Sequence, residues 1–171
     1  MLRPLQVLRL YAPHAGTLAT LLAARVAVAP QRECLVFEGR ALSYAQVQAL
    51  AERAAALYAA RGVRAGDRVG VMSTNHPFTV ITLLALARLG AVMVPVNPDC
   101  RAAEAGFVFG HAQVSGVLCA PDTLATVREA VAKIAPAPWL MLNRPGAEGG
   151  LPDFDAALAA APDTGVPDAG T

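Results

Sequence analysis

Small polar residues that could contact a ligand follow two apolar segments of the sequence. Residues 73–75 (Ser-Thr-Asn) come after the segment 69–72, and Asn97 comes after the segment 91–96. In an open parallel sheet, ligands bind outside the carboxyl ends of the strands. We therefore predict a substrate crevice that includes Asn75 and Asn97. The structural alternative is that Asn75 caps a helix and Asn97 forms a turn.

The other reactive residue types form no catalytic or metal-binding pattern. His14, His76 and His111 are scattered, and none has an acidic or nucleophilic partner at motif spacing. The three cysteines show no C-x-x-C spacing, so we predict neither a metal cluster nor a disulfide framework. Neither common phosphate-binding loop, G-x-G-x-x-G or G-x-x-x-x-G-K-[ST], occurs. The residues alone assign no catalytic or metal-ligating group and indicate a soluble α/β domain.

Composition excludes several classes of protein. Hydrophobic residues make up 55% of the chain, which is too apolar for a disordered chain, and a net charge of +1 without a basic stripe argues against a nucleic-acid partner. The longest strongly apolar run, residues 79–87, is too short for a transmembrane segment. Arginines alone supply charge before Glu33, which weakly resembles a transit peptide. Because residues 17–29 already have the pattern of a domain helix, we favour chance and predict a cytoplasmic protein.

Blocks of apolar and polar residues predict alternating strands and helices. A helix over 17–29 precedes a hairpin over 34–42, and Ser43 with Gln46 forms a capping box that begins the next helix. Buried strands are expected at 69–72, 91–96, 116–119 and 139–142, and further helices at 78–89, 101–111, 121–134 and 154–160. This order predicts an α/β fold with a parallel sheet flanked by helices. The first three of these strands are continuously apolar, as central strands are.

Two of the expected helices have unusual features. The helix over 78–89 is apolar on nearly every side, which predicts burial. Gly106 is expected to weaken the helix over 101–111.

The chain divides into three predicted regions. Residues 1–16 are predicted to be an N-terminal arm, residues 17–160 the domain, and residues 161–171 a linker-like tail.

Several segments resemble motifs of AMP-forming acyl-CoA synthetases and other adenylate-forming enzymes. LSYAQV at 42–47 is similar to their L-[ST]-Y-x-[EQ]-[LV] opening, and GDRVGV at 66–71 to their G-D-[RV]-V-[AG] strand. The closest match is LARLGAVMVPVNP at 86–98, which resembles L-A-x-x-[KR]-x-G-A-x-x-x-P-[LV]-N-P. The resemblance covers about residues 17–142, and the order and spacing of the motifs identify residues 17–160 as part of the N-terminal, AMP-binding-type domain of such an enzyme.

The resemblance implies ATP-dependent conversion of a carboxylate to an acyl-adenylate, followed by thioester formation with coenzyme A or a carrier. Magnesium assists in the family by neutralising phosphate charge, and the setting implied is fatty acid metabolism. The family's phosphate loop ends in Pro-Lys-Gly, and that sequence does not occur in these 171 residues. The chain alone is therefore expected to be inactive and to bind none of ATP, magnesium and coenzyme A.

Two other functions remain open. The chain could be a stand-alone scaffold or interaction domain with the same fold and no catalysis, or a small-ligand-binding module that uses the strand-end crevice. Its mean hydropathy of +0.44 and the apolar helix over 78–89 predict exposed apolar surface. We expect that surface to contact the remainder of a ligase or a second copy of the chain.

Overall fold

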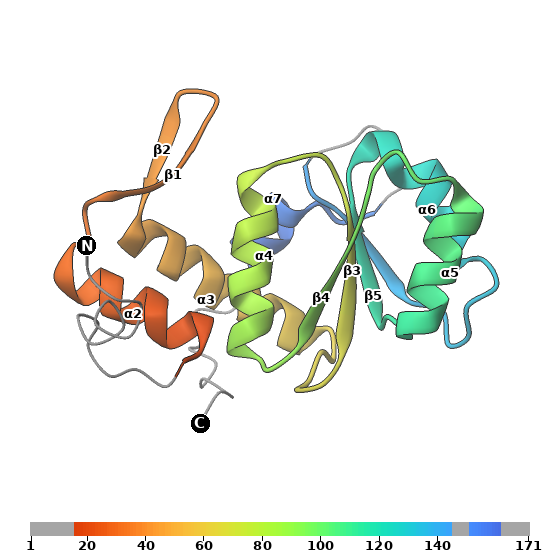
Figure 1. The fold of residues 1–171 in the computed structure, drawn as a ribbon, viewed down its shortest axis with the longest axis horizontal. Coiled ribbons are helices and arrows are strands. Elements are labelled where there is room, and N and C mark those ends of the chain that lie inside the picture. The colour runs from red at the N-terminus through yellow and green to blue at the C-terminus, as the bar shows by residue number, and fades with distance from the viewer. Residues whose placement is uncertain (1–15, 145–150, 162–171) are drawn as a thin grey trace, which may run out of the picture.

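The computed structural model describes residues 16–144 and 151–161, so the predicted arm and tail fall outside it except for Gly16 and Ala161. The elements follow the predicted order (Figure 1). The helices are α2 (Leu18–Val28), α3 (Tyr44–Ala60), α4 (Pro77–Arg88), α5 (Ala102–Ala112), α6 (Leu124–Val131) and α7 (Phe154–Ala160), with a short 3-10 helix, η1 (Pro121–Thr123). The strands are β1 (Glu33–Phe37), β2 (Arg40–Ser43), β3 (Arg68–Met72), β4 (Val92–Val96), β5 (Gly116–Cys119) and β6 (Trp139–Leu142).

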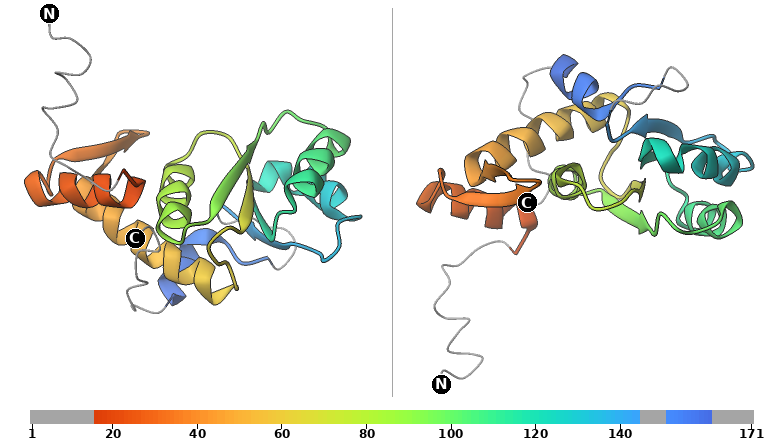
Figure 2. Two further views of the ribbon diagram at one scale, coloured as in Figure 1. Left: turned by 60° about the horizontal axis from the view of Figure 1, so that its bottom comes forward. Right: turned by 90° about the horizontal axis from the view of Figure 1, so that it is seen from above.

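Four parallel strands form the central sheet, in the order β4-β3-β5-β6. One cluster of buried side chains joins the sheet to α3, α4 and α7, and a second joins its opposite face to α5 and α6. Figure 2 shows the two groups of helices on opposite sides of the sheet. The predicted α/β class is therefore confirmed.

Strand β4 lies at an edge of the described sheet, so the prediction that it is central was wrong. Its register with β3 pairs Arg68 with Val92 and Met72 with Val96. The Val92 N–H donates to Asp67 O at 2.8 Å, and alternation along a parallel strand then turns the backbone of Pro95 away from β3. Proline suits a position whose backbone faces away from the neighbouring strand, because it has no N–H that would be left unpaired. The sequence of β4 is as apolar as that of a central strand, yet Val92 in this strand is 51% exposed. Composition therefore did not show that β4 is an edge strand.

The hairpin and α2 lie together at one end of the molecule (Figure 1). Strands β1 and β2 are antiparallel, and Glu38 and Gly39 between them both have positive φ, 48° and 74°, as a tight hairpin turn requires. The predicted capping box of α3 is confirmed, because Ser43 N donates to Gln46 Oε1 at 2.8 Å and Gln46 N donates to Ser43 Oγ at 3.3 Å. Helix α2 packs against α3 and α4.

Helix α4 differs from its prediction at its start and on its outer side. The cap is His76, not Asn75: the Phe78 N–H donates to His76 Nδ1 at 3.2 Å, and Pro77 occupies the first helical turn. Burial is one-sided, since Val80 and Leu83 are each 37% exposed. Helix α4 is apolar on all sides, but its outer side is not covered by another element among the described residues.

Gly106 is a site of close packing between α5 and α6. A Cβ at this position would lie 2.9 Å from the backbone oxygen of Ala130 in α6. That separation is shorter than real Cβ contacts, so only glycine permits α5 and α6 to approach this closely. The prediction from helix propensity missed the contact because it depends on a partner 24 positions further along the sequence.

Candidate active site

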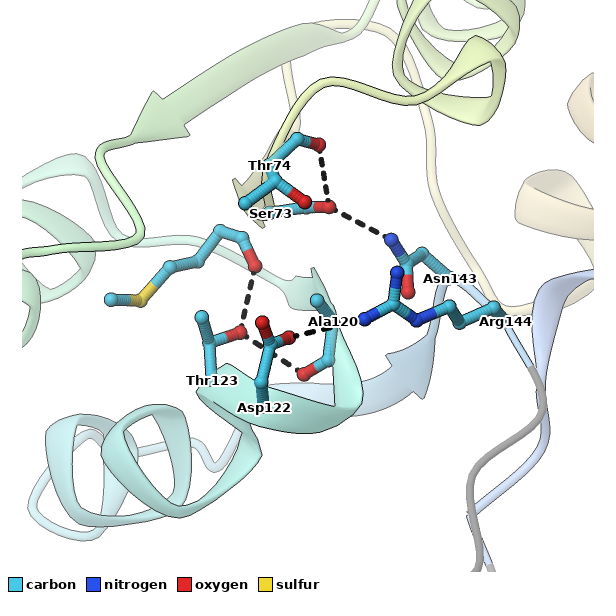
Figure 3. Close-up of polar contacts among 8 residues, drawn as sticks. Ser73, Thr74, Ala120, Asp122, Thr123, Asn143 and Arg144 are labelled. Atoms are coloured by element: carbon cyan, nitrogen blue, oxygen red, sulfur yellow. Dashed lines mark hydrogen bonds and ion pairs between the residues drawn. The ribbon is translucent and has the colours of Figure 1, made fainter. Parts of the chain in front are cut away.

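The carboxyl ends of β3, β5 and β6 meet in a polar cluster (Figure 3). Asn143, directly after β6, donates from Nδ2 to Ser73 Oγ at 2.8 Å, and Ser73 Oγ donates in turn to Thr74 O at 2.9 Å. The Asn143 N–H donates to Cys119 O at 2.9 Å. One asparagine therefore connects the ends of three strands.

Thr123 fixes the other side of this cluster. Its Oγ1 lies 2.9 Å from Met72 O and 3.1 Å from Ala120 O, so the hydroxyl hydrogen is directed at two strand-end carbonyls. The Ala120 N–H also donates to Met72 O, at 3.1 Å. Because Thr123 is only 6% exposed, these bonds hold the ends of β3 and β5 together without competition from solvent.

The amide oxygen of Asn143 has unused hydrogen-bonding capacity. Asn143 is 1% exposed, and its Oδ1 has no hydrogen-bond partner among the described residues. A buried acceptor without a donor costs about 1–3 kcal/mol. A donor delivered to this oxygen would recover that cost, so Asn143 is the strongest candidate for a polar contact at this edge of the sheet.

An exposed ion pair borders the cluster. Arg144 Nη2 lies 3.6 Å from Asp122 Oδ1, and the two side chains are 47% and 59% exposed. Exposed pairs of this kind contribute between about 0 and 1 kcal/mol. Arg144 can therefore exchange Asp122 for another anion at little cost in stability.

The two predicted crevice residues lie at the same edge but outside this hydrogen-bonded cluster. Asn75 is exposed, two positions after Ser73. Asn97 is also exposed, and its Oδ1 accepts a hydrogen bond from the Asp99 N–H at 3.0 Å, so it does form a turn. Their role in substrate binding stays a prediction. Asn143 was missed, although it carries the signal that selected Asn97, a polar residue directly after an apolar strand.

The described residues offer no cluster of metal ligands. Residues 16–144 and 151–161 contain no group of three or more His, Cys, Asp or Glu side chains that could hold a metal. Burial also raises the pKa of the Cys119 thiol from 9.0 to about 12, which keeps this group protonated and unreactive near neutral pH. The cluster can bind and orient a polar group, and no chemical step is assigned to it.

Comparison with models of protein families shows the family to which this chain belongs. The model of the AMP-binding family, described as AMP-binding enzyme, matches residues 22–163. The chain therefore belongs to the AMP-binding enzyme family. Among residues 16–144 and 151–161, no helix has both the length and the apolar character needed to cross a membrane.

Individual relatives include a CoA ligase and a polypeptide of a synthase. The medium/long-chain-fatty-acid–CoA ligase FadD6 of Mycobacterium tuberculosis (strain ATCC 25618 / H37Rv) is 33% identical over 114 residues, which cover 67% of this chain and 19% of that protein. One polypeptide of the plipastatin synthase of Bacillus subtilis (strain 168) is 40% identical over 86 residues, 50% of this chain and 3% of that protein. The chain thus spans less than a fifth of the length of either relative.

Solved structures show the same fold. A Mycobacterium tuberculosis fatty acyl CoA synthetase matches with a TM-score of 0.72 and 25% identity over 88% of this chain and 29% of that chain. A benzoate CoA ligase from Burkholderia xenovorans LB400 matches with a TM-score of 0.80 over 91% of this chain and 30% of that chain. Its sequence identity of 17% supports the fold alone.

Proposed function

We propose that this chain is the N-terminal part of an ATP-dependent ligase that converts a fatty acid and coenzyme A to an acyl-CoA thioester in the cytoplasm. The observation that carries the proposal is the 33% identity to a medium/long-chain-fatty-acid–CoA ligase over 67% of the chain. In this reaction the carboxylate displaces pyrophosphate from ATP, and the thiol then displaces AMP from the acyl-adenylate.

The contribution of these residues is structural and substrate-positioning. The four-stranded sheet supports a polar cluster at its carboxyl edge, where open α/β sheets bind ligands. Asn75 and Asn97 follow adjacent strands at that edge. We assign the 171-residue chain no catalysis of its own, because adenylation needs donors held against the phosphates and the chain lacks a Pro-Lys-Gly loop to provide them.

The proposed partner is the remainder of the ligase polypeptide. The outer edge of β4 and the outer side of α4 expose Val92, Val80 and Leu83. Such apolar surface is typical of an interface between parts of a larger domain. Self-association through the same surface is the expected behaviour when the remainder of the ligase is not present.

A second candidate is a small-ligand-binding module, which is favoured by Asn143 Oδ1, an acceptor with no partner among the described residues. The stand-alone scaffold is a third candidate, and the DNA downstream of this coding sequence distinguishes it from a ligase. A reading frame that continues into a Ser/Thr/Gly-rich loop ending in Pro-Lys-Gly supports the ligase. A stop codon with no adjacent ligase gene supports the scaffold.

The direct test of the proposed reaction uses the polypeptide encoded by the continuous reading frame. It is assayed for acyl-CoA formation from ATP, coenzyme A and a series of straight-chain fatty acids, with benzoate and amino acids as comparison substrates. We expect fatty acids of medium or long chain to give the highest kcat/KM. Activity confined to amino acids or aromatic acids would overturn the substrate class while leaving the family intact.

A further inference from the structure

Helix α2 presents an apolar stripe to solvent. Leu18, Leu21 and Val28 are 43%, 39% and 76% exposed, and Ala19 is the one buried residue of the helix. At 3.6 residues per turn, positions 18, 21, 25 and 28 lie on one side of a helix. Helix α2 therefore has three exposed apolar side chains in a row, with Arg25 among them.

No other described element covers this stripe. Helix α2 packs against α3 and α4, and it lies at the end of the molecule remote from α5 and α6 (Figure 1). The guanidinium of Arg25 lies 5.9 Å from the centre of the Tyr44 ring, a contact that holds its charge close to the helix. The stripe is therefore an ordered surface that combines apolar side chains with a cation.

Charge is unevenly distributed toward this end of the sequence. Residues 1–32 contain four of the 14 Lys and Arg residues and none of the 13 Asp and Glu residues of the chain. Just beyond α2, Arg32 is exposed, and so is the adjacent Glu33, the first acidic residue of the sequence. Arg25 in an exposed apolar helix, with Arg32 just beyond it, matches the chemistry of an anionic lipid surface, which attracts basic residues and accepts apolar side chains at its boundary.

We propose that the exposed side of α2 binds the surface of an anionic phospholipid bilayer. The helix lies in the plane of the interface, with Leu18, Leu21 and Val28 at the acyl boundary and Arg25 beside lipid phosphates. Its 11 residues are too short to span the bilayer. This inference does not rest on the proposed ligase activity.

Lipid fits this surface better than a second copy of the chain. A copy packed along the same stripe would bury the guanidinium of Arg25 against apolar side chains, and an unpaired buried charge is unfavourable. A lipid phosphate instead forms charge-assisted hydrogen bonds with that group. Arg25 therefore makes contact with an anionic lipid surface more favourable than contact with an apolar protein surface.

The test is flotation of the full 171-residue chain with vesicles of phosphatidylcholine alone or of phosphatidylcholine mixed with phosphatidylglycerol. Leu18→Gln combined with Val28→Gln removes apolar contact, and Arg25→Gln removes charge. Val36→Gln is the matched control, because Val36 is 65% exposed but belongs to the hairpin. Circular dichroism and thermal melting establish that each variant is folded.

We expect the wild-type chain to bind the anionic vesicles. The double variant should lower the partition coefficient at least about tenfold, and Arg25→Gln about fivefold. Val36→Gln should leave binding unchanged. Failure of the wild-type chain to bind anionic vesicles, or equal binding by the double variant, overturns the proposal. So does a double variant that abolishes self-association in sedimentation while vesicle binding is retained, because that result assigns the stripe to a second copy.

Discussion

Asn143 donates a 2.8 Å hydrogen bond to Ser73, a residue 70 positions earlier in the chain, and this bond joins the loops that follow β6 and β3. Strand β5 lies between those two strands, so the bond crosses the carboxyl edge of the sheet. The relationship gives this edge a defined conformation. It also makes the Asn143 side chain, whose Oδ1 has no partner among the described residues, part of the binding surface proposed there.

Removing the hydroxyl of Ser73 should destabilise the fold. Ser73→Ala leaves the Asn143 Nδ2 donor buried without its acceptor, so we expect unfolding to become easier by about 1–3 kcal/mol. Urea unfolding followed by fluorescence of Trp139, the only tryptophan, measures the change. The double variant with Asn143→Ala should cost less than the sum of the single variants, by about 1 kcal/mol. Strict additivity would contradict a direct bond between the two side chains.

Two glycines of α5 should respond in opposite ways to alanine. Gly106→Ala places a Cβ against Ala130 O, so we expect a loss of about 1–3 kcal/mol as α5 and α6 separate. Gly110→Ala has nothing within 4 Å of its Cβ and should stabilise the fold by up to about 1 kcal/mol through helix propensity. Urea midpoints of the two variants provide the comparison. Stabilisation by both changes would contradict the close contact at Gly106.

The three thiols should react at different rates. Cys119 is buried, whereas Cys34 and Cys100 are half-buried, so a thiol reagent near pH 8 should modify those two in the native chain. Cys119 should react only after denaturation. Its folded pKa of about 12 exceeds the ordinary value of 9.0, so its contribution to stability is full below pH 9 and falls as pH rises toward 12. Cys119→Ala should flatten that alkaline loss, and rapid native labelling of Cys119 would contradict its burial.

The isolated chain should self-associate through the outer edge of β4. Val92 is 51% exposed there, and an open strand edge is a template for pairing with another chain. Val92→Lys should lower the association observed by sedimentation at micromolar concentration, while Val36→Lys on the hairpin should not. A monomer at all concentrations that binds no hydrophobic dye would favour a self-contained domain.

Local sequence patterns predicted the elements of the fold well. The period of apolar residues located the helices, and Ser43 with Gln46 located the start of α3, because both signals depend on neighbours within one turn. The alternation of strands and helices was enough to predict a parallel sheet. The order of the strands was not predictable in this way, since β4 has the composition of a central strand and lies at an edge of the sheet.

Properties that depend on distant residues were predicted poorly. The cap of α4 is His76 because the chain path after β3 brings its ring nitrogen, and not Asn75, to the Phe78 N–H. The partner of Asn143 is 70 residues away, so no local pattern could show that bond. The strand-end rule selected Asn75 and Asn97, which are both exposed at the carboxyl edge of the sheet, and their role in substrate binding stays a prediction.

We propose that this chain is part of a ligase whose adenylation chemistry depends on further residues. The most direct measurement is fatty-acid-dependent exchange of labelled pyrophosphate into ATP, with the purified 171-residue chain compared with the polypeptide encoded by the continuous reading frame. We predict no exchange above background for the chain alone and clear exchange for the longer polypeptide. Exchange by the 171-residue chain itself would show that adenylation needs no further residues, contrary to the proposal.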